Sequence, residues 1–429
     1  MLPIESAVVT SILSRSWRYH WTKRTDFHLD DRLWVDNDAG DYDFVDFVDS
    51  ALRIDHNIDV SMNKLHLKIN DLHFDYDNLD EWIDFAVARN LGALDLDLSS
   101  SDILRDHRAG TIELRSELYT YGTLKALKLN GLFILINDGH VICLPKLIDL
   151  KLENVWYESY ESLPNLISGS PSLTSLEITR DWNDNMVVCT ISSPVLKRID
   201  LLFLVSTPDA DFKLVIDTPG LEFLSLTDYS SKEILSLQTT LTCLDYVRLT
   251  GSSPCQSFVG LIQAFDRVGC LVIDSDMLTL HGGNYTKLLA NFQRLSSLQI
   301  TINGGYEFFS CVMGLIDSCP ALNKLSIFSR NRLRQSISRS RRVPLTVPKC
   351  LVSTITTFHY WVFEGLKVEI AMLKFILNHA LVLKTFDVGF HRHRDGAHYL
   401  EAELSLLQKT FQKTFACFAV SPACEVTVC

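Results

Sequence analysis

Three histidines and an aspartate near the carboxyl end of the sequence are the residues whose types and spacing best suit chemistry: His391, His393, Asp395 and His398. Imidazole and carboxylate groups bind Zn²⁺, and two histidines at positions i and i+2 share one face of a strand. Arginines flank the histidines, however, and their positive charge would repel a metal ion. A metal site and a polar hairpin or loop are both open interpretations of this segment. We favour the loop and predict no metal site.

No other segment has the pattern of a catalytic centre. The sequence has no P-loop, no H-E-x-x-H helix and no G-x-S-x-G turn. Cys311 and Cys319 are eight positions apart, about two helical turns, which suits a buried helix face better than a redox pair. The sequence therefore predicts a protein that is not an enzyme and needs no cofactor.

Composition limits the partners that the chain can have. The formal net charge is −12 over 429 residues, which disfavours nucleic acid because phosphate binding requires a concentrated basic surface. No run approaches the roughly 20 apolar residues of a membrane-spanning helix, so we expect no membrane contact. The 11 cysteines have no repeated spacing, and no secretion signal is recognisable. These features predict a location in the cytoplasm or nucleus.

The sequence pattern indicates leucine-rich repeats, and the strands of these repeats would hold the residues of any binding surface in place. An octamer of the form P-x-L-x-x-[LI]-x-[LI] begins at Pro145, Pro171, Pro194, Pro219 and Pro320. Looser copies fill the intervals, so that the first apolar residue recurs every 23 to 27 positions, within the range of roughly 20 to 29 for leucine-rich repeats. These first residues are Leu124, Leu147, Leu173, Leu196, Leu221, Leu244, Val268, Leu295 and Leu322.

The alternation of side chains along a strand explains this spacing. Paired leucines two positions apart point to the same face, and stacked repeats bury that face together. We predict an α/β leucine-rich-repeat solenoid with a parallel sheet on its concave face. Helical periodicity at residues 159–170 and 308–319 predicts helices between strands. We expect a single stacked row of inward residues to include Leu150, Ile178, Leu201 and Leu226.

The side chains between and beside the paired leucines should point to solvent on the concave face. They mix both charges with two phenylalanines and a tyrosine, which suits protein recognition. The alternative is a solvated sheet that has no partner. The predicted target-binding residues are Asp149, Lys151, Glu153, Ser175, Glu177, Arg198, Asp200, Phe223, Ser225, Tyr246, Arg248, Ser297, Gln299, Lys324, Ser326 and Phe328.

A basic segment at residues 329–342 interrupts the repeats with six arginines and no acidic residue. A solvated loop is the simplest interpretation of this composition. A nuclear-import patch and an anion site are the alternatives, since arginine suits phosphate groups.

The amino-terminal sequence LPIESAVVTSILSRSWRYHW, at residues 2–21, resembles the second half of a plant F-box. In that family the F-box is a small helical module that docks a Skp-type adaptor, and through it cullin and the ubiquitin-transfer machinery. The resemblance implies that the adaptor-binding residues are Leu2, Pro3, Ala7, Val8, Ile12, Leu13, Trp17 and Trp21. A helix that simply caps the first repeat is an equally open interpretation. Family members normally have a further helix before the position of Leu2, so we expect the partial F-box to bind the adaptor more weakly.

The carboxyl-terminal part resembles the plant FBD domain in three segments, at residues 347–365, 372–388 and 418–428. Leu373, Ile376, Leu377 and Leu381 predict a helical apolar stripe there, and the segments around Ile355 and Leu383 should continue the sheet. We expect a partial F-box at residues 1–40, irregular repeats at 41–345 and an FBD-like domain at 346–429.

These resemblances together suggest a member of the plant F-box/FBD/leucine-rich-repeat proteins. The resemblance implies a non-catalytic substrate-recognition subunit of an SCF-type E3 ubiquitin ligase, which binds an unknown target protein through the repeats. The alternative is a stand-alone protein-interaction module, or a non-functional remnant, that no longer docks the adaptor.

Overall fold

A computed structural model describes most of the chain between Arg24 and Val428. The described residues are 24–33, 42–53, 61–70, 77–99, 112–131, 133–135, 141–180, 185–204, 212–228, 234–237, 241–251, 265, 267–274, 292–302, 306–329, 347–390, 409, 411 and 424–428. The predicted adaptor-binding residues, the arginine-rich segment apart from Ser329, and the histidine cluster at 391–398 lie outside these ranges.

The chain divides into two compact units. Unit 1 comprises Met1–Leu221 with Ser236–Thr239, and unit 2 comprises Glu222–Leu235 with Thr240–Cys429. Strand β14 (Ile234–Leu237) has residues in both units. In each unit the main sheet is parallel and its strands follow one another in sequence order, as expected for stacked repeats.

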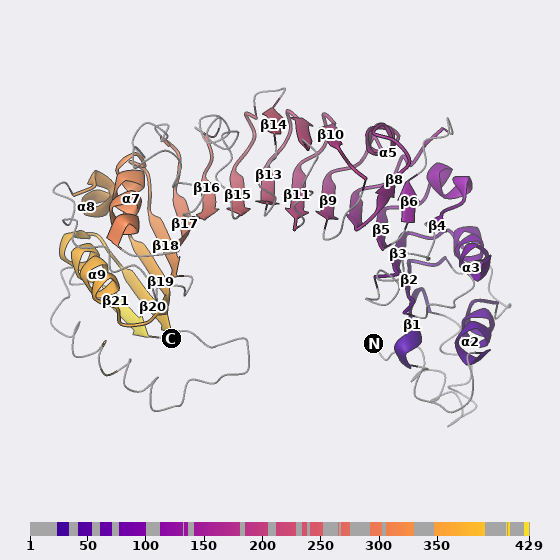
Figure 1. Cartoon of the computed structure of the whole chain (residues 1–429), viewed down its shortest axis with the longest axis horizontal. Helices are drawn as coiled ribbons and strands as arrows, with labels where there is room; N and C mark the ends of the chain where they lie inside the picture. Colours follow the sequence, from indigo (N-terminus) through magenta and orange to yellow (C-terminus); the bar gives the residue numbers. More distant parts are fainter. Residues whose placement is uncertain are drawn as a thin grey trace. The chain divides into compact units, whose positions relative to one another are not determined.

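Unit 1 has a main sheet and a second layer of short elements (Figure 1). The main sheet contains β1 (Asp26–Asp30), β2 (Lys64–Lys68), β3 (Ala93–Asp97), β5 (Ala126–Asn130), β7 (Asp149–Glu153), β9 (Ser175–Arg180) and β11 (Arg198–Phe203). The second layer contains α2 (Tyr42–Arg53), α3 (Asp77–Ala88), β4 (Ile112–Glu113), η3 (Ser116–Thr120), β6 (Phe133–Leu135), β8 (Trp156–Tyr157), α5 (Ser162–Ser168), β10 (Val188–Ser192) and β12 (Lys213–Asp217). A short 3-10 helix, η2 (Asp31–Leu33), follows β1.

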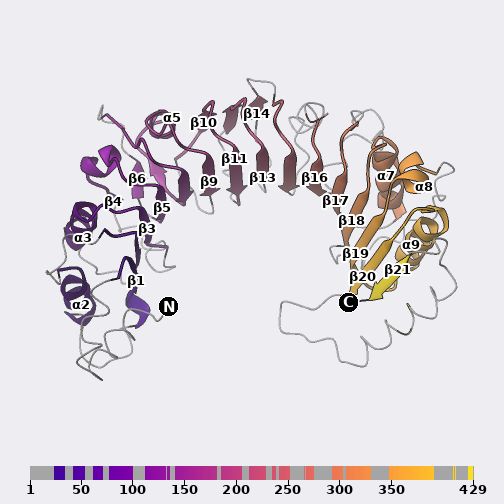
Figure 2. The same ribbon diagram turned by 180° about the vertical axis from the view of Figure 1, so that it is seen from behind.

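Unit 2 continues the same strand pattern with longer helices. Its sheet contains β13 (Phe223–Asp228), β15 (Tyr246–Gly251), β16 (Cys270–Asp274), β17 (Ser297–Ile302), β18 (Lys324–Ser329), β19 (Thr357–Phe363), β20 (Thr385–Phe390) and β21 (Glu425–Val428). Three helices, α7 (Tyr306–Asp317), α8 (Lys349–Ser353) and α9 (Lys367–His379), lie together on one side of β17–β20 in both views (Figures 1 and 2).

Two rows of apolar side chains run across the buried face of the sheet in unit 1. Strand register aligns the members of each row, and their side chains are at most 2% exposed. The first row contains Leu127, Leu150, Leu176 and Ile199, and the second contains Leu129, Leu152, Ile178 and Leu201. Burial of this apolar area holds neighbouring repeats together at about 25 cal/mol per Å².

The same two rows recur in unit 2, where all of their members are at most 1% exposed. The first contains Leu224, Val247, Leu271, Leu298, Leu325, Phe358 and Phe386, and the second contains Leu226, Leu249, Ile273, Ile300, Ile327, Tyr360 and Val388. The predicted parallel repeats are therefore confirmed in both units.

One detail of the predicted row is wrong. Leu150 lies opposite Leu176 in the first row, whereas Ile178 and Leu201 lie in the second row, opposite Leu152. Leu226 lies in a second row as well, opposite Leu249 of unit 2. The two inward positions of a strand are two residues apart and chemically alike, so sequence alone does not distinguish them.

The predicted helices form with small differences in extent. Residues 159–170 contain α5, and residues 308–319 overlap α7. In α9, Leu373, Ile376 and Leu377 are buried as expected, but Leu381 lies beyond the helix and is 54% exposed. The segments after Ile355 and Leu383 continue the sheet as β19 and β20. Among the described helices, none has both the length and the apolar composition to cross a membrane.

A buried carboxylate organises the start of α9. Glu369, at the third helical position, accepts hydrogen bonds from the backbone N–H groups of Leu366 (2.9 Å) and Glu364 (3.1 Å) and from the Tyr360 hydroxyl (2.8 Å). The side chain is only 2% exposed, and this burial raises the pKa of Glu369 against the opposing effect of its donors. The carboxylate thereby ties the helix to β19.

Candidate functional site: the exposed face of the sheet

The candidate site is the face of each sheet that points away from the two apolar rows. Along most strands, such as β5, β7 and β17, buried residues alternate with residues that lie on this exposed face, whereas β16 is buried at four of its five positions. All sixteen predicted target-binding residues occupy its positions. Fourteen are half-buried or exposed, whereas the short side chains of Ser225 (2% exposed) and Ser326 (7%) are covered. Those two serines therefore offer little surface to a partner.

The exposed face of unit 1 carries a network of ion pairs, the first part of which is centred on Asp95. Asp95 lies 3.0 Å from the Nδ1 atom of His66, 3.3 Å from the Lys64 ammonium and 3.8 Å from that of Lys128. Burial alone would raise the pKa of Asp95, but the hydrogen bond and charge of His66, with the two lysines, lower it to about 2. Asp95 is therefore ionised throughout the physiological pH range.

The network continues across β7 and β9 through Lys151. Its ammonium lies 2.7 Å from Glu153 and 2.7 Å from Glu177, each on the same face. Burial lowers the pKa of Lys151, but the hydrogen bonds and charges of the two glutamates outweigh this effect and raise it. On β11, Arg198 pairs with Asp200 at 3.0 Å. Charged side chains on this face thus neutralise one another.

The exposed face of unit 2 is more aromatic. Phe223 on β13 and Tyr246 on β15 stack with their ring centroids 4.5 Å apart and their planes within 4°. Three strands beyond β15 in the same sheet, Phe328 on β18 and Trp361 on β19 lie with centroids 6.1 Å apart. His359, two residues before Trp361, stacks beside the indole at 6.1 Å with an interplanar angle of 13°.

Sequence analysis missed several residues of this face. His66, Asp95 and Lys128 lie on β2, β3 and β5, and His359 and Trp361 lie on β19. The alternation of leucine with polar residues in segments such as KLHLK (64–68) and ALDLD (93–97) was the signal that could have identified the first three. To identify His359 and Trp361 as residues of this face, the strand register of β19 had to be known.

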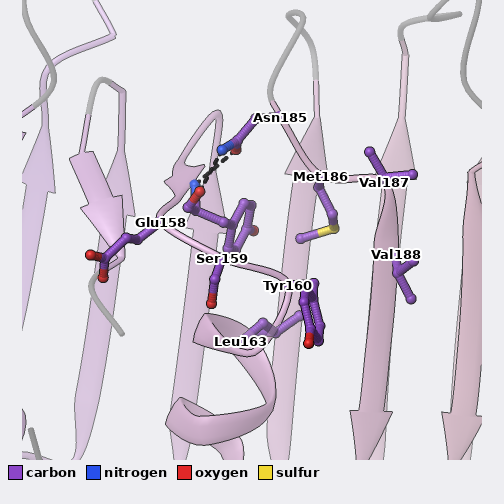
Figure 3. Close-up of a pocket in the computed structure, with 9 residues that line it drawn as sticks. Glu158, Ser159, Tyr160, Leu163, Asn185, Met186, Val187 and Val188 are labelled. Atoms are coloured by element: carbon purple, nitrogen blue, oxygen red, sulfur yellow. Dashed lines mark hydrogen bonds between the residues drawn. The ribbon is translucent and has the colours of Figure 1, made fainter. Parts of the chain in front are cut away.

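A pocket of about 280 Å³ lies behind the sheet in unit 1, between β8, α5 and β10 (Figure 3). Its lining includes Tyr157, Tyr160, Leu163, Met186 and Val188. The Asn185 side chain bridges to the Tyr157 backbone, accepting from its N–H at 3.0 Å and donating to its carbonyl, and so extends the edge of β8. This volume lies just below the range of about 300 to 1,000 Å³ that ligand pockets commonly have.

Among the described residues, no group of three or more His, Cys, Asp and Glu side chains is arranged to hold a metal ion. The aromatic groups are of the residue types enriched at protein-recognition surfaces.

Comparisons with known proteins agree with this architecture. The family model of the At1g61320/AtMIF1 LRR domain matches residues 52–416. The chain is 27% identical over 398 residues to the F-box/FBD/LRR-repeat protein At5g56420 of Arabidopsis thaliana, covering 90% of this chain and 86% of that protein. It is 25% identical over 455 residues to the Arabidopsis FBD-associated F-box protein At5g22730, covering 100% of this chain and 91% of that protein.

These similarities indicate an F-box-type protein-interaction role, and the matched relatives carry the F-box, FBD and leucine-rich-repeat features that the sequence predicted. The family model spans most of the chain, from residue 52 to residue 416 of 429, so the chain belongs to the At1g61320/AtMIF1 leucine-rich-repeat family.

Proposed function

We propose that this protein is a non-catalytic substrate receptor of an SCF-type E3 ubiquitin ligase. In this role the amino-terminal F-box-like segment docks a Skp-type adaptor, and the exposed face of the sheet binds the target protein. The observation that carries the proposal is the exposed face itself, because a framework of fully buried rows holds charged and aromatic side chains at the surface. Tryptophan, tyrosine and arginine, all present on this face, are the residue types most enriched at binding hot spots.

The similarity of residues 2–21 to the plant F-box supports the adaptor half of the proposal. Purified full-length chain should retain a recombinant Skp-type adaptor on an affinity column. Replacing Leu13 and Trp17 by aspartate should abolish retention, because each lost apolar contact costs roughly 1.5 to 3 kcal/mol. Retention no greater than that of these variants would refute the ligase role and leave a stand-alone interaction module.

The target half is tested by site-specific crosslinking. A photo-reactive amino acid at Gln299, on the exposed face of β17, should capture the target from a plant extract. The same group at Val352, which is 38% exposed on helix α8, serves as the matched control. Equal capture of one protein from both positions would contradict binding at the sheet.

A further inference from the structure

An aromatic platform lies on the exposed face of unit 2. We use this name for Phe328, His359 and Trp361, whose half-buried rings belong to neighbouring strands β18 and β19. The three rings are nearly parallel, with interplanar angles of 28° between Phe328 and Trp361 and 13° between His359 and Trp361. Aromatic side chains supply a large contact area at a low cost in conformational entropy, because each has only two side-chain torsions.

The absence of a side chain at Gly389 makes room for the Trp361 indole. Gly389 on β20 lies opposite Trp361, and a Cβ at this position would overlap the indole atoms Cε3 and Cζ3. The next residue of β19, Val362, has φ of 69°, and the register with β20 shifts between Trp361 and Phe363. A β-branched residue with positive φ is strained, and such strain concentrates at functional sites.

A carboxylate lies beside the platform. Asp387 Oδ2 is 3.0 Å from His359 Nδ1, and the Asp387 side chain is 17% exposed. Burial lowers the pKa of His359, and Lys324 adds to this effect while Asp387 opposes it. At neutral pH the histidine is therefore mostly uncharged, and the His359–Asp387 pair keeps a negative charge next to the aromatic surface.

The combination of flat rings and a carboxylate selects one kind of side chain. A guanidinium group is planar, stacks on aromatic faces and pairs with carboxylates, whereas an ammonium group is compact and strongly hydrated. Lys324 lies four residues before Phe328 on β18, on the side of His359 away from Trp361, and its charge lowers the pKa of His359.

We propose that the aromatic platform binds an arginine side chain of the target protein, with the guanidinium stacked on Trp361 and paired with Asp387. This inference rests on the proposed use of the exposed face for target binding. It names the chemistry that the face of unit 2 recognises: a protein segment with an accessible arginine.

The test uses full-length protein labelled with ¹⁵N at tryptophan. The probes are the blocked amino acids acetyl-arginine amide, acetyl-lysine amide and acetyl-citrulline amide. Arginine should shift the Trp361 indole resonance, which is assigned by its loss in Trp361→Phe. Lysine has the same charge as arginine, so it controls for general attraction to a protein of net charge −12. Citrulline has the same shape without the charge.

Arginine should bind about two- to fivefold more tightly than either control, as expected for a cation over a partly exposed ring. Asp387→Asn should remove much of this preference. Asp317→Asn makes the same charge change at the exposed end of helix α7, away from the exposed face of the sheet, and should have no effect. Phe328→Ala, which leaves the indole in place, should also weaken binding.

Three results would overturn the inference: no movement of the Trp361 resonance, equal binding of citrulline, or equal weakening by Asp317→Asn. None of these measurements involves the adaptor or the natural target. Loss of adaptor binding would therefore refute the ligase role and leave the arginine site standing, whereas the reverse outcome would refute only the arginine site.

Discussion

The exposed faces of the two units differ, although their buried faces are alike. In unit 1 the face is occupied by charged residues that pair with one another, such as Asp95 with Lys64 and Lys151 with Glu177. In unit 2 the same strand positions hold stacked aromatic rings, such as Phe223 with Tyr246. The framework therefore fixes where side chains are displayed but not which chemistry they display.

This difference predicts that the two units contribute differently to the affinity and the selectivity of target binding. A paired charge must lose water when a partner covers it, so its net contribution to affinity is small, although it influences association rate and partner choice. Covering an aromatic ring with a partner lowers the free energy of the complex, because apolar surface is removed from water. We therefore expect unit 2 to supply most of the affinity for a target and unit 1 to supply selectivity.

The largest loss of stability should come from substitutions in the buried apolar rows, which both units have. Leu176→Ala in unit 1 and Leu298→Ala in unit 2 should each cost about 2 to 5 kcal/mol in free energy of unfolding, because both leucines are fully buried. Ser175→Ala and Ser297→Ala, the adjacent residues on the exposed face, should change it by less than about 0.5 kcal/mol. Urea denaturation followed by circular dichroism measures all four. A serine variant as costly as its leucine neighbour would contradict the assignment of the two faces.

Sequence predicted this shared framework because the leucine period is also its physical cause. The first apolar residue of each repeat and the paired leucines of each strand are buried where the spacing placed them. The second-layer strands β10 and β12 were not predicted, because they lie outside the recurring P-x-L-x-x-[LI]-x-[LI] segments, although each is five residues long like β5 and β7. The aromatic platform could not be predicted from the sequence for a different reason. It depends on the strand register, which places Gly389 next to Trp361 and leaves room for the indole.

A smaller loss of stability should follow when the buried carboxylate of unit 2, Glu369, is replaced. Glu369→Ala leaves two backbone N–H groups without their acceptor and should cost about 2 to 3 kcal/mol. Because burial raises the folded-state pKa of Glu369 above its ordinary value of 4.5, its pH-dependent contribution is fully present below that value and is lost as the pH rises through the folded pKa. Amide hydrogen exchange in α9 and β19 measures both changes. Glu369→Gln should remove the pH dependence, and an unchanged slope in that variant would show that another group causes it.

The exposed face of unit 1 should show the opposite pH dependence. The pKa of Asp95 is lowered from 3.8 to about 2, so the stability that it contributes is present above pH 3.8 and is lost as the pH falls towards 2. Asp95→Asn should cost about 1 to 2 kcal/mol at neutral pH and remove this acid-sensitive part. Hydrogen exchange in β2, β3 and β5 reports the loss, and β17 and β18 of unit 2 provide the internal control. A loss of equal size in unit 2 would mean that the effect is not local to the ion pairs.

The smallest effect concerns salt, and it tests whether the charges of unit 1 act as a network. Lys151→Ala should lower the stability of unit 1 by only about 0.2 to 1 kcal/mol, because its side chain is 32% exposed and solvent weakens both of its ion pairs. Salt shortens the range of such interactions from about 10 Å at 0.1 M to about 3 Å at 1 M, so the difference between variant and wild type should shrink as salt rises. Gln299→Ala, an uncharged change on the face of unit 2, should be insensitive to salt. If the Lys151→Ala difference persists at 1 M salt, the lysine stabilises β7 and β9 through the packing of its aliphatic stem, and the contrast between the two faces is then one of shape as much as of charge.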